Sequence, residues 1–296
     1  MNIRITSFVL AAALVASAAA AEPANSIRSE SSVDSSRTGR WIGPDGKYLP
    51  FTTDAQVIEF LRTAEVVDTK EIEGSSNRPL RLLLEKDGVR ARAIFRTVDV
   101  ERESMRHVQE HARGFRDNYT YEVAAYELSR LLGLRNVPPA TLRTFDRQKG
   151  SVQLWVEKAK GVVDRIEEGI DPNHEKLWLY QKQNMAVFDN LIYNFDRNPG
   201  NILIDVLGQV WFVDHTRSFK KLPALNGRDD IKVCERSLYE NLRNLDPEEV
   251  REHLDPYLTE VEIDALMARK KKLVKFLEKR IRRHGESAIL FEFVRS

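Results

Sequence analysis

The chain has 296 residues, with 46 basic and 45 acidic side chains, so its formal net charge is +1. This balance gives no support for broad electrostatic binding to nucleic acid, and no specific nucleic-acid partner is expected. Cys234 is the single cysteine of the sequence, which excludes an internal disulfide. With 42% apolar residues, the chain is long enough to fold around one or two hydrophobic cores.

Residues 1–21 are typical of a secretory signal peptide. Arg4 lies in a short positive region, an apolar segment follows, and residues 19–21 supply the alanines of a small-residue cleavage site. The apolar segment is short for a transmembrane helix, which needs about 20 apolar residues; an uncleaved anchor is the alternative. Cleavage near Ala21 predicts an exported protein that is periplasmic or extracellular.

The next residues, 22–40, are rich in serine and charge and are expected to form a flexible linker. The fold is expected to begin near Trp41. Apolar residues at helical spacing and a capping box of Thr53 with Gln56 predict a helix over residues 54–65.

Strand signals dominate the segment that follows. Residues 66–72 are weakly strand-like, and residues 78–98 are two apolar runs joined at Asp87-Gly88, a strong turn dipeptide. Residues 118–134 have the apolar spacing of a helix. Two further strands are expected at residues 137–145 and 151–159.

The second half of the chain is mainly helical in pattern. One long helix is predicted over residues 174–194 and further helix over residues 246–283, with two short strands and a polar loop between them. This order predicts an α+β fold of two lobes separated by a cleft. The β-rich N-terminal lobe is expected over residues 41–157 and the helical C-terminal lobe over residues 158–296.

The polar loop carries Asp196 and Asn201, and the strand that follows delivers Asp214. A magnesium-bound polyphosphate requires hard oxygen ligands, which carboxylates and carboxamides provide. Phosphoryl transfer also requires a carboxylate that orients and deprotonates the attacking hydroxyl. These residue types at this spacing therefore indicate the base and the metal ligands of a kinase-like enzyme.

Three segments resemble the atypical branch of the protein-kinase-like superfamily, which includes the phosphatidylinositol 3- and 4-kinases, the HipA-type kinases and the secretory four-jointed-like kinases. FDNLIYNFDRNPGN, residues 188–201, matches the Asp-Arg-x-x-x-Asn signature of that branch. FVDHTRSF, residues 212–219, resembles the segment equivalent to Asp-Phe-Gly. Residues 121–142 resemble the helix that bears the ion-pairing glutamate, with the strand after it.

This resemblance implies a two-lobed kinase fold with a nucleotide in the cleft. It implies that Asp196 is the catalytic base and that Asn201 and Asp214 bind Mg²⁺ or Mn²⁺. It also implies that Arg96, positioned by Glu122, contacts the phosphates of ATP or another nucleoside triphosphate.

The resemblance further implies where the rest of the nucleotide lies. A turn at Gly74, Ser75 and Ser76 is expected to cover the phosphates through its backbone amides. The nucleotide base is expected near Glu157 and Ala159. The acceptor is not specified and could be a protein, a lipid or a small molecule.

Arg96 departs from the family pattern, which has lysine at this place. Arginine also binds phosphate, but its wide planar head does not replace a compact ammonium group neutrally. Two functions are therefore expected from the resemblance: an exported kinase, or a pseudokinase that acts as a nucleotide-binding or regulatory interaction module without catalysis. An unrelated α+β binding protein is a third possibility.

Each candidate residue also has a structural explanation. Asp196 and Asn201 could belong to a solvent turn, and Asp214 could cap a strand end. A calcium loop beginning at Asp196 does not fit, because an EF-hand needs glycine where Asn201 stands and glutamate where Leu207 stands.

The other candidates also have structural explanations. Glu122 could be a solvated helix residue, and Arg96 could face outward from an arginine-rich hairpin. His215 is expected to be a hydrogen-bonded structural residue, and Cys234 an inert small apolar residue.

The basic segment RKKKLVKFLEKRIRR, residues 269–283, combines an apolar stripe with clustered positive charge. One interpretation is a helix packed on the C-terminal lobe with a solvated basic face. The other is a surface for an anionic partner.

Overall fold

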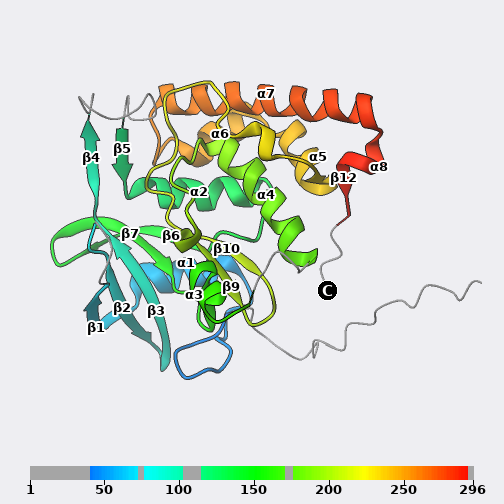
Figure 1. Ribbon diagram of the computed structural model, residues 1–296. Coiled ribbons are helices and arrows are strands. Elements are labelled where there is room, and N and C mark those ends of the chain that lie inside the picture. The colour runs from blue at the N-terminus through cyan, green and yellow to red at the C-terminus, as the bar shows by residue number, and fades with distance from the viewer. Residues whose placement is uncertain (1–40, 73–76, 103–114, 171–175, 293–296) are drawn as a thin grey trace, which may run out of the picture. The chain divides into compact units, whose positions relative to one another are not determined.

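The structure is a computed structural model that describes residues 41–72, 77–102, 115–170 and 176–292 (Figure 1). The predicted signal peptide and linker, and Gly74, Ser75 and Ser76, lie outside these residues. The described residues have the expected α+β organisation, in which a β-rich part precedes a helical part. None of their helices has the length and apolar content needed to cross a membrane.

The main sheet of the N-terminal lobe contains β1 (Glu65–Glu71), β2 (Leu80–Lys86), β3 (Val89–Arg96), β6 (Ala140–Phe145) and β7 (Gln148–Leu154). These five antiparallel strands are ordered β1-β2-β3-β7-β6. Asp87 and Gly88 turn the chain between β2 and β3 at φ of 51° and 75°. A two-residue hairpin turn favours this left-handed pair. The predicted hairpin is confirmed, and it brings Arg96 to the end of β3.

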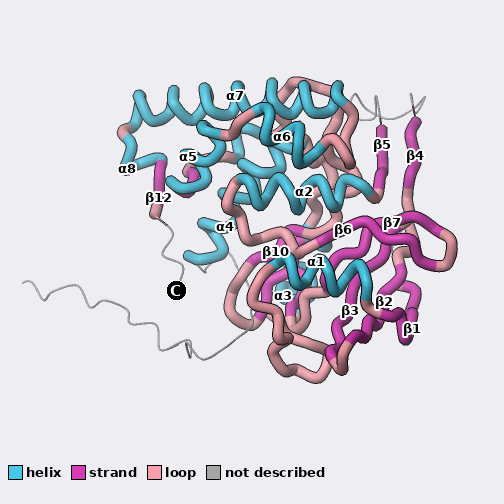
Figure 2. Tube along the Cα trace, turned by 180° about the vertical axis from the view of Figure 1, so that it is seen from behind, coloured by secondary structure: helices cyan, strands magenta, loops and turns pink. Residues whose placement is uncertain are grey.

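Helices α1 (Asp54–Thr63) and α2 (Thr120–Leu131) pack against this sheet. Figure 2 shows α1 lying across the strands. The predicted capping box begins α1. The backbone amide of Gln56 donates to Thr53 Oγ1 at 3.3 Å, and the backbone amide of Thr53 donates to the side-chain oxygen Oε1 of Gln56 at 3.1 Å. The capping box satisfies amides that the first helical turn cannot bond, which explains why the helix begins here.

The C-terminal lobe is built from α4 (Lys176–Ile192), α5 (Arg236–Asn244), α6 (Pro247–Leu254), α7 (Glu260–His284) and α8 (Glu286–Ile289). The helical stretch predicted over residues 246–283 is divided between α6 and α7. Pro256 lies in the break and has no amide to continue a helical ladder. Thr259 then caps α7 in a second capping box with Glu262.

Several short elements were not predicted: α3 (Val162–Glu167), the pair β4 (Asp99–Arg102) and β5 (Phe115–Asn118), and the parallel pair β11 (Cys234–Glu235) and β12 (Leu290–Phe291). The two short strands expected around the polar loop are β9 (Ile202–Asp205) and β10 (Val210–Phe212). β8 (Ala159–Gly161) adds to β9 to give a three-stranded sheet. The loop that carries Asp196 and Asn201 leads directly into β9.

The buried apolar residues form two clusters, one around the five-stranded sheet with α1 and the other around α2 and the C-terminal helices. β10 contributes to both, because Trp211 belongs to the first cluster and Phe212 to the second. Alternate residues of a strand point to opposite faces, so one short strand can join two cores. β10 therefore holds the segment before Asp214 against both lobes.

The apolar stripe predicted in the basic segment is present on α7. Leu266, Leu273 and Leu277 are fully buried in the second cluster, and Ile281 packs against it. Cys234 is also fully buried, and burial raises the pKa of its thiol. The interpretation of Cys234 as a small core residue agrees with this position.

Candidate active site

A cavity of about 550 Å³ brings the main candidate residues together. Its lining includes Arg96 at the end of β3, Asp196 and Asn201 in the loop before β9, and Asp214 after β10. Residues far apart in the sequence therefore face one space between the sheet and the polar loop. Arg96 and Arg217 supply positive charge to this space, and Asp196, Asn201 and Asp214 supply oxygen-bearing side chains.

Arg96 points into the protein, so the outward-facing alternative is wrong. Its side chain is only 8% exposed, and its Nε lies 3.8 Å from Glu122 Oε1. The Arg96 Nη1 atom is buried and has no hydrogen-bond partner among the described residues. Arg96 thus pairs with Glu122 and lines the cavity, and one of its guanidinium nitrogens has no partner in the described part of the chain.

Glu122 is fully buried, which rules out a solvated helix glutamate. The backbone amide of His215 donates to Glu122 Oε1 at 2.7 Å, and Gln153 Nε2 donates to Oε2 at 3.3 Å. His215 Nδ1 also lies 3.3 Å from Oε2. His215 therefore has the structural role expected for it: it connects the segment after Asp214 to α2.

Burial of the Glu122 carboxyl favours its neutral form and by itself raises the pKa. The charge of Arg96 and the hydrogen bonds from His215 outweigh burial and lower the pKa to about 2, from an ordinary value of 4.5. A carboxylate held ionised at this depth fixes the position of the Arg96 guanidinium.

This pKa predicts how folding stability depends on pH. Ionised Glu122 stabilises the folded state above its ordinary pKa, and that stabilisation is lost as the pH falls toward its lowered pKa of about 2. Between about pH 5 and pH 3 the expected loss from this group is about 2 kcal/mol. Urea unfolding of the wild type and of Glu122→Gln at both pH values measures it. The glutamine variant should lose less stability over this interval; equal losses would contradict the role of Glu122.

Arg197 organises the loop that carries Asp196 and Asn201. Its Nε and Nη2 donate to the two carboxylate oxygens of Asp189 on α4, each at 3.0 Å. Its Nη1 donates to the carbonyl oxygens of Asn201 at 2.8 Å and Val213 at 2.7 Å. One planar guanidinium thus connects α4, the polar loop and the end of β10, which fixes the separation of Asn201 from Asp214.

The side chain of Asn201 is oriented by the same loop. Its Nδ2 donates to the backbone oxygen of Asp196 at 2.9 Å. The side-chain amide nitrogen of Asn201 therefore points to the loop, and its side-chain oxygen points away from the loop. The loop contains turn hydrogen bonds, as its composition indicated. The turn places Asn201 in the lining of the cavity.

Asp214 has a left-handed backbone with φ of 59°. This conformation is uncommon for residues other than glycine, although aspartate tolerates it better than most. Thr216 Oγ1 donates to Asp214 Oδ1 at 3.0 Å. Such backbone strain is often found where a side chain must be aimed at a ligand.

Arg217 is a cavity residue that the sequence analysis missed. Its Nη1 donates to Asp196 Oδ2 and its Nε to Asp117 Oδ2, both at 2.9 Å. Asn77 Nδ2 donates to the same oxygen of Asp117 at 2.9 Å. Asp117 lies on β5, which was not predicted. The sequence signal that could have identified Arg217 was therefore its position shortly after Asp214.

Glu157 and Ala159 are not among the residues that line the cavity, which Leu154, Trp155 and Val156 do line. Arg92 Nη1 lies 3.4 Å from Glu157 Oε2. Burial raises the pKa of the Glu157 carboxyl, and Arg92 partly opposes this effect. Ala159 pairs with Asp205 between β8 and β9. Contact of this strand connection with a nucleotide base stays a prediction.

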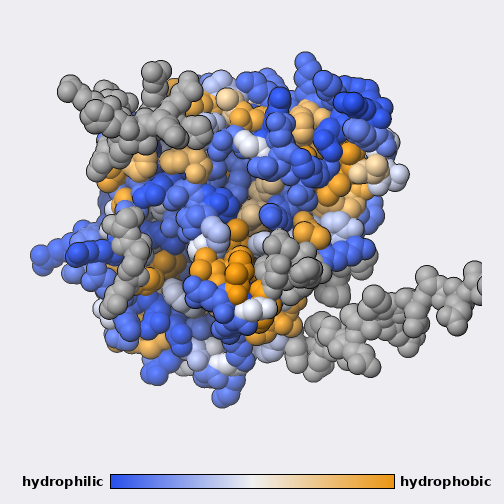
Figure 3. All heavy atoms as spheres, in the orientation of Figure 1, coloured by the Kyte–Doolittle hydropathy of each residue, from blue (hydrophilic) through white to orange (hydrophobic). Residues whose placement is uncertain are grey.

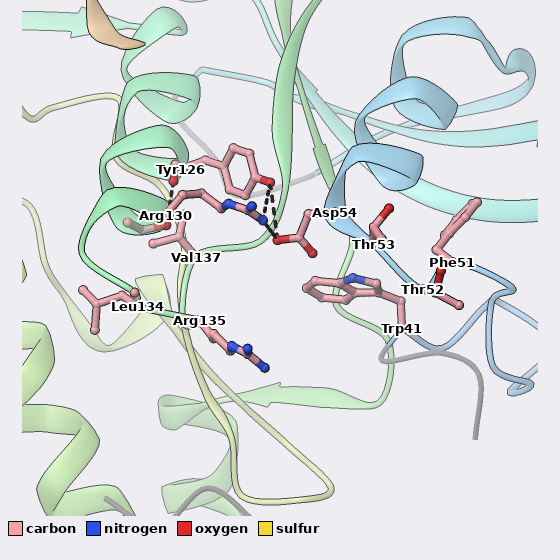
Figure 4. A pocket seen from close by; sticks show the side chains of 12 residues that line it. Trp41, Phe51, Thr52, Thr53, Asp54, Tyr126, Arg130, Leu134, Arg135 and Val137 are labelled. Carbon is pink, nitrogen blue, oxygen red and sulfur yellow. Dashed lines mark hydrogen bonds and ion pairs between the residues drawn. The ribbon is translucent and has the colours of Figure 1, made fainter. Parts of the chain in front are cut away.

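A second cavity, of about 480 Å³, lies between the start of α1 and the end of α2. Figure 4 shows Asp54, Tyr126 and Arg130 pointing toward one another there. Arg130 Nη1 forms an ion pair with Asp54, and the Tyr126 hydroxyl lies 3.5 Å from the same carboxylate oxygen. Asp54 and Arg130 pair with each other, so we assign no chemistry to this cavity.

Comparison with known proteins identifies the class of fold. No protein-family model matches the sequence. Protein Rv2133c of Mycobacterium tuberculosis is 32% identical over 122 residues, a match that covers 32% of this chain and 44% of that protein. The chain thus matches less than half the length of this relative.

Two structures share the arrangement of elements over most of the chain. The structure of hydra Fam20 with sugar has a TM-score of 0.61 at 16% identity and covers 80% of this chain and 92% of that one. The Golgi casein kinase with Mn and ADP bound has a TM-score of 0.59 at 15% identity, covering 80% and 78%. The chain therefore has an atypical protein-kinase-like fold, as the sequence resemblance implied.

Proposed function

We propose that the chain is a kinase-like phosphotransferase that transfers the γ-phosphoryl group of ATP, or of another nucleoside triphosphate, to an acceptor hydroxyl. The observation that carries this proposal is the cavity shared by Arg96, Asp196, Asn201 and Asp214. A cation, two hard oxygen donors and a further carboxylate around one space are the groups that phosphoryl transfer needs. The Mn and ADP bound to the Golgi casein kinase support a nucleotide and a divalent cation as ligands.

In this reaction the acceptor oxygen forms a bond to the γ-phosphorus, and the bond from that phosphorus to the bridging oxygen breaks. The nucleoside diphosphate leaves with the electron pair of the broken bond. Asp196 accepts the proton of the acceptor hydroxyl. Because Arg217 bonds to Asp196 Oδ2, the Oδ1 atom is the one placed to take that proton.

The donors fit a divalent cation and a phosphate chain. Asn201 and Asp214 would supply two oxygen ligands to Mg²⁺, and phosphate oxygens and water would supply the others. The cation would neutralise phosphate charge during transfer. The guanidinium of Arg96, which lines the cavity, would contact a phosphate oxygen.

Asp214→Asn tests the metal assignment. This variant keeps the size of the side chain and its tolerance of the left-handed backbone, but it removes the charged ligand. In the wild type, Mg²⁺ and nucleotide at about 100 times Kd should add roughly 2.7 kcal/mol of stability, seen as a raised melting temperature. The magnesium-dependent part should disappear in Asp214→Asn and persist in Asp87→Asn, the same change in the β2–β3 turn. A full magnesium-dependent shift in Asp214→Asn would show that metal binding does not need the charge of Asp214.

A pseudokinase is the second candidate function. The observation that favours it is Arg96 at the position where the kinase pattern has lysine. The same cavity would then bind nucleotide without phosphoryl transfer, and the chain would act as a binding or regulatory module. Measurement of transfer separates the two, because both functions predict nucleotide binding.

We also propose export of the chain, on the signal-peptide pattern of residues 1–21. The acceptor would then be met outside the cytoplasm. Structures of the same fold include one with a sugar and one of a casein kinase, which support a sugar hydroxyl or a protein side chain as the acceptor class. A lipid or another small molecule remains an acceptor to be tested in the same assay.

A further inference from the structure

A groove on the C-terminal lobe concentrates positive charge outside the candidate active site. It has a volume of about 830 Å³ and lies between α7 and the segment 224–229. Six basic side chains line it: Arg228, Lys272, Lys275, Lys279, Arg280 and Arg283. Among the described lining residues Asp229 is the one acidic side chain, so the lining has a formal charge of +5 with His284 neutral. Hydrophilic side chains also cover the C-terminal end of α7 on the face shown in Figure 3.

The walls of the groove are held by specific contacts. The guanidinium groups of Arg228 and Arg280 lie 6.0 Å and 5.8 Å from the ring centroid of Phe276, which provides an apolar surface between them. Lys272 Nζ donates to the Pro223 carbonyl oxygen at 2.7 Å, and Arg280 Nη2 donates to that of Lys232 at 3.0 Å. Arg280 Nε is buried without a hydrogen-bond partner in the described part of the chain. The Arg280 guanidinium is thus held in place on one wall of the groove.

The length of the groove indicates the kind of ligand. Lys272 and Arg283 are separated by roughly 16 Å along the helix axis, at 1.5 Å per residue. An extended peptide advances about 3.3 Å per residue, so about five residues would span this distance. A single phosphate would satisfy only part of the charge. The spacing therefore favours an extended chain with repeated negative charge.

The chemistry of the surface favours a peptide over a membrane or a nucleic acid. The apolar stripe of α7, including Leu273 and Leu277, is buried in the core, so α7 offers no apolar face for insertion into a lipid surface. Binding of single-stranded nucleic acid usually uses several aromatic platforms for base stacking. In the described groove lining Phe276 is the aromatic residue, and guanidinium groups flank its ring.

The groove is also connected to the candidate active site through the chain itself. Arg269 on α7 is fully buried and donates to the carbonyl oxygens of Leu191, Lys220 and Leu222 at 2.7, 2.8 and 2.5 Å. It thereby fixes the segment that leaves Asp214, and the continuation of that segment forms one wall of the groove. A ligand in the groove would rest on the same segment that carries Arg217.

We propose that this groove binds an acidic peptide segment of a partner protein. The inference concerns binding and does not depend on phosphoryl transfer. The test uses the full chain and a short fluorescent peptide of alternating glutamate and serine, with binding followed by fluorescence anisotropy. The wild type should bind this peptide at low salt, more weakly at high salt, and should not bind a peptide in which every glutamate is replaced by glutamine.

The decisive variant is Lys279→Gln/Arg283→Gln, which removes two exposed charges from the groove. It should weaken binding of the glutamate peptide roughly five- to tenfold, since each exposed ion pair contributes a modest factor. The matched control is Lys271→Gln/Arg282→Gln, which removes two exposed charges of the same helix outside the groove lining. This control should bind as the wild type does.

Three outcomes would overturn the proposal. The first is failure of the wild type to bind the glutamate peptide. The second is equal weakening in both double variants, which would indicate attraction by the net charge of α7 and not by the groove. The third is that the wild type binds vesicles of mixed anionic and neutral phospholipid, or a single-stranded oligonucleotide, more tightly than the glutamate peptide. That binding would also have to be lost in Lys279→Gln/Arg283→Gln.

Discussion

Replacing Asp196 with asparagine is expected to lower the rate of phosphoryl transfer by about 10²- to 10⁴-fold, the usual contribution of a positioned general base. Asparagine has the same size and can still accept the hydrogen bond from Arg217, but it cannot take the proton of an acceptor hydroxyl. Folding should be little affected, because the Asp196 side chain is 34% exposed. Autophosphorylation and nucleotide hydrolysis with Mg²⁺ or Mn²⁺ measure the rate.

The matched control for this variant is Asp87→Asn, the same chemical change in the turn between β2 and β3. Asparagine tolerates the left-handed conformation of this position, so the control should fold and react as the wild type does. Weak but real wild-type activity that Asp196→Asn removes would support the kinase. Equal signals in the wild type and Asp196→Asn would exclude transfer through this site and leave the pseudokinase.

Replacing Arg96 with alanine is expected to nearly abolish transfer and also to destabilise the fold by about 3–5 kcal/mol. The stability effect follows because Glu122 would remain buried without its cation. The activity effect follows from the proposed function, because the variant lacks the cation that would contact the phosphates. Urea unfolding and the transfer assay measure the two effects separately.

A double variant distinguishes these two roles of Arg96. Arg96→Met/Glu122→Gln removes both buried charges, while glutamine can still accept the hydrogen bond from the His215 amide. It should recover most of the stability lost in Arg96→Ala, because no uncompensated charge stays buried. Transfer should stay absent. Recovery of transfer in the double variant would show that Arg96 acts only through stability.

Arg96→Lys addresses whether the site is adapted to arginine. The planar guanidinium of Arg96 places Nε 3.8 Å from Glu122 Oε1, whereas a lysine ammonium is a single compact charge on a flexible stem. In an arginine-adapted kinase, Arg96→Lys should lower turnover or leave it level. If arginine were a degenerative change in a pseudokinase, lysine should instead raise transfer above that of the wild type.

Much of the fold could be predicted because its signals are local. The turn dipeptide Asp87-Gly88 determines the hairpin that ends at Arg96, and the capping box of Thr53 and Gln56 determines the start of α1. These features depend on the backbone preferences of a few neighbouring residues. The short strands β4, β5 and β8 could not be predicted in the same way, since their pairing partners come from elsewhere in the chain.

The sequence by itself determined the two-lobed α+β order and the spacing of Asp196, Asn201 and Asp214. Only the tertiary structure decided which charges meet. Glu122 bonds to an amide 93 positions away, and Asp117 to a side chain 100 positions away. No local pattern encodes such contacts, because they form only when separate elements pack together and exclude water. That packing is what pairs Arg217 with Asp196, turns Arg96 inward, and gathers the basic residues of α7 into a groove.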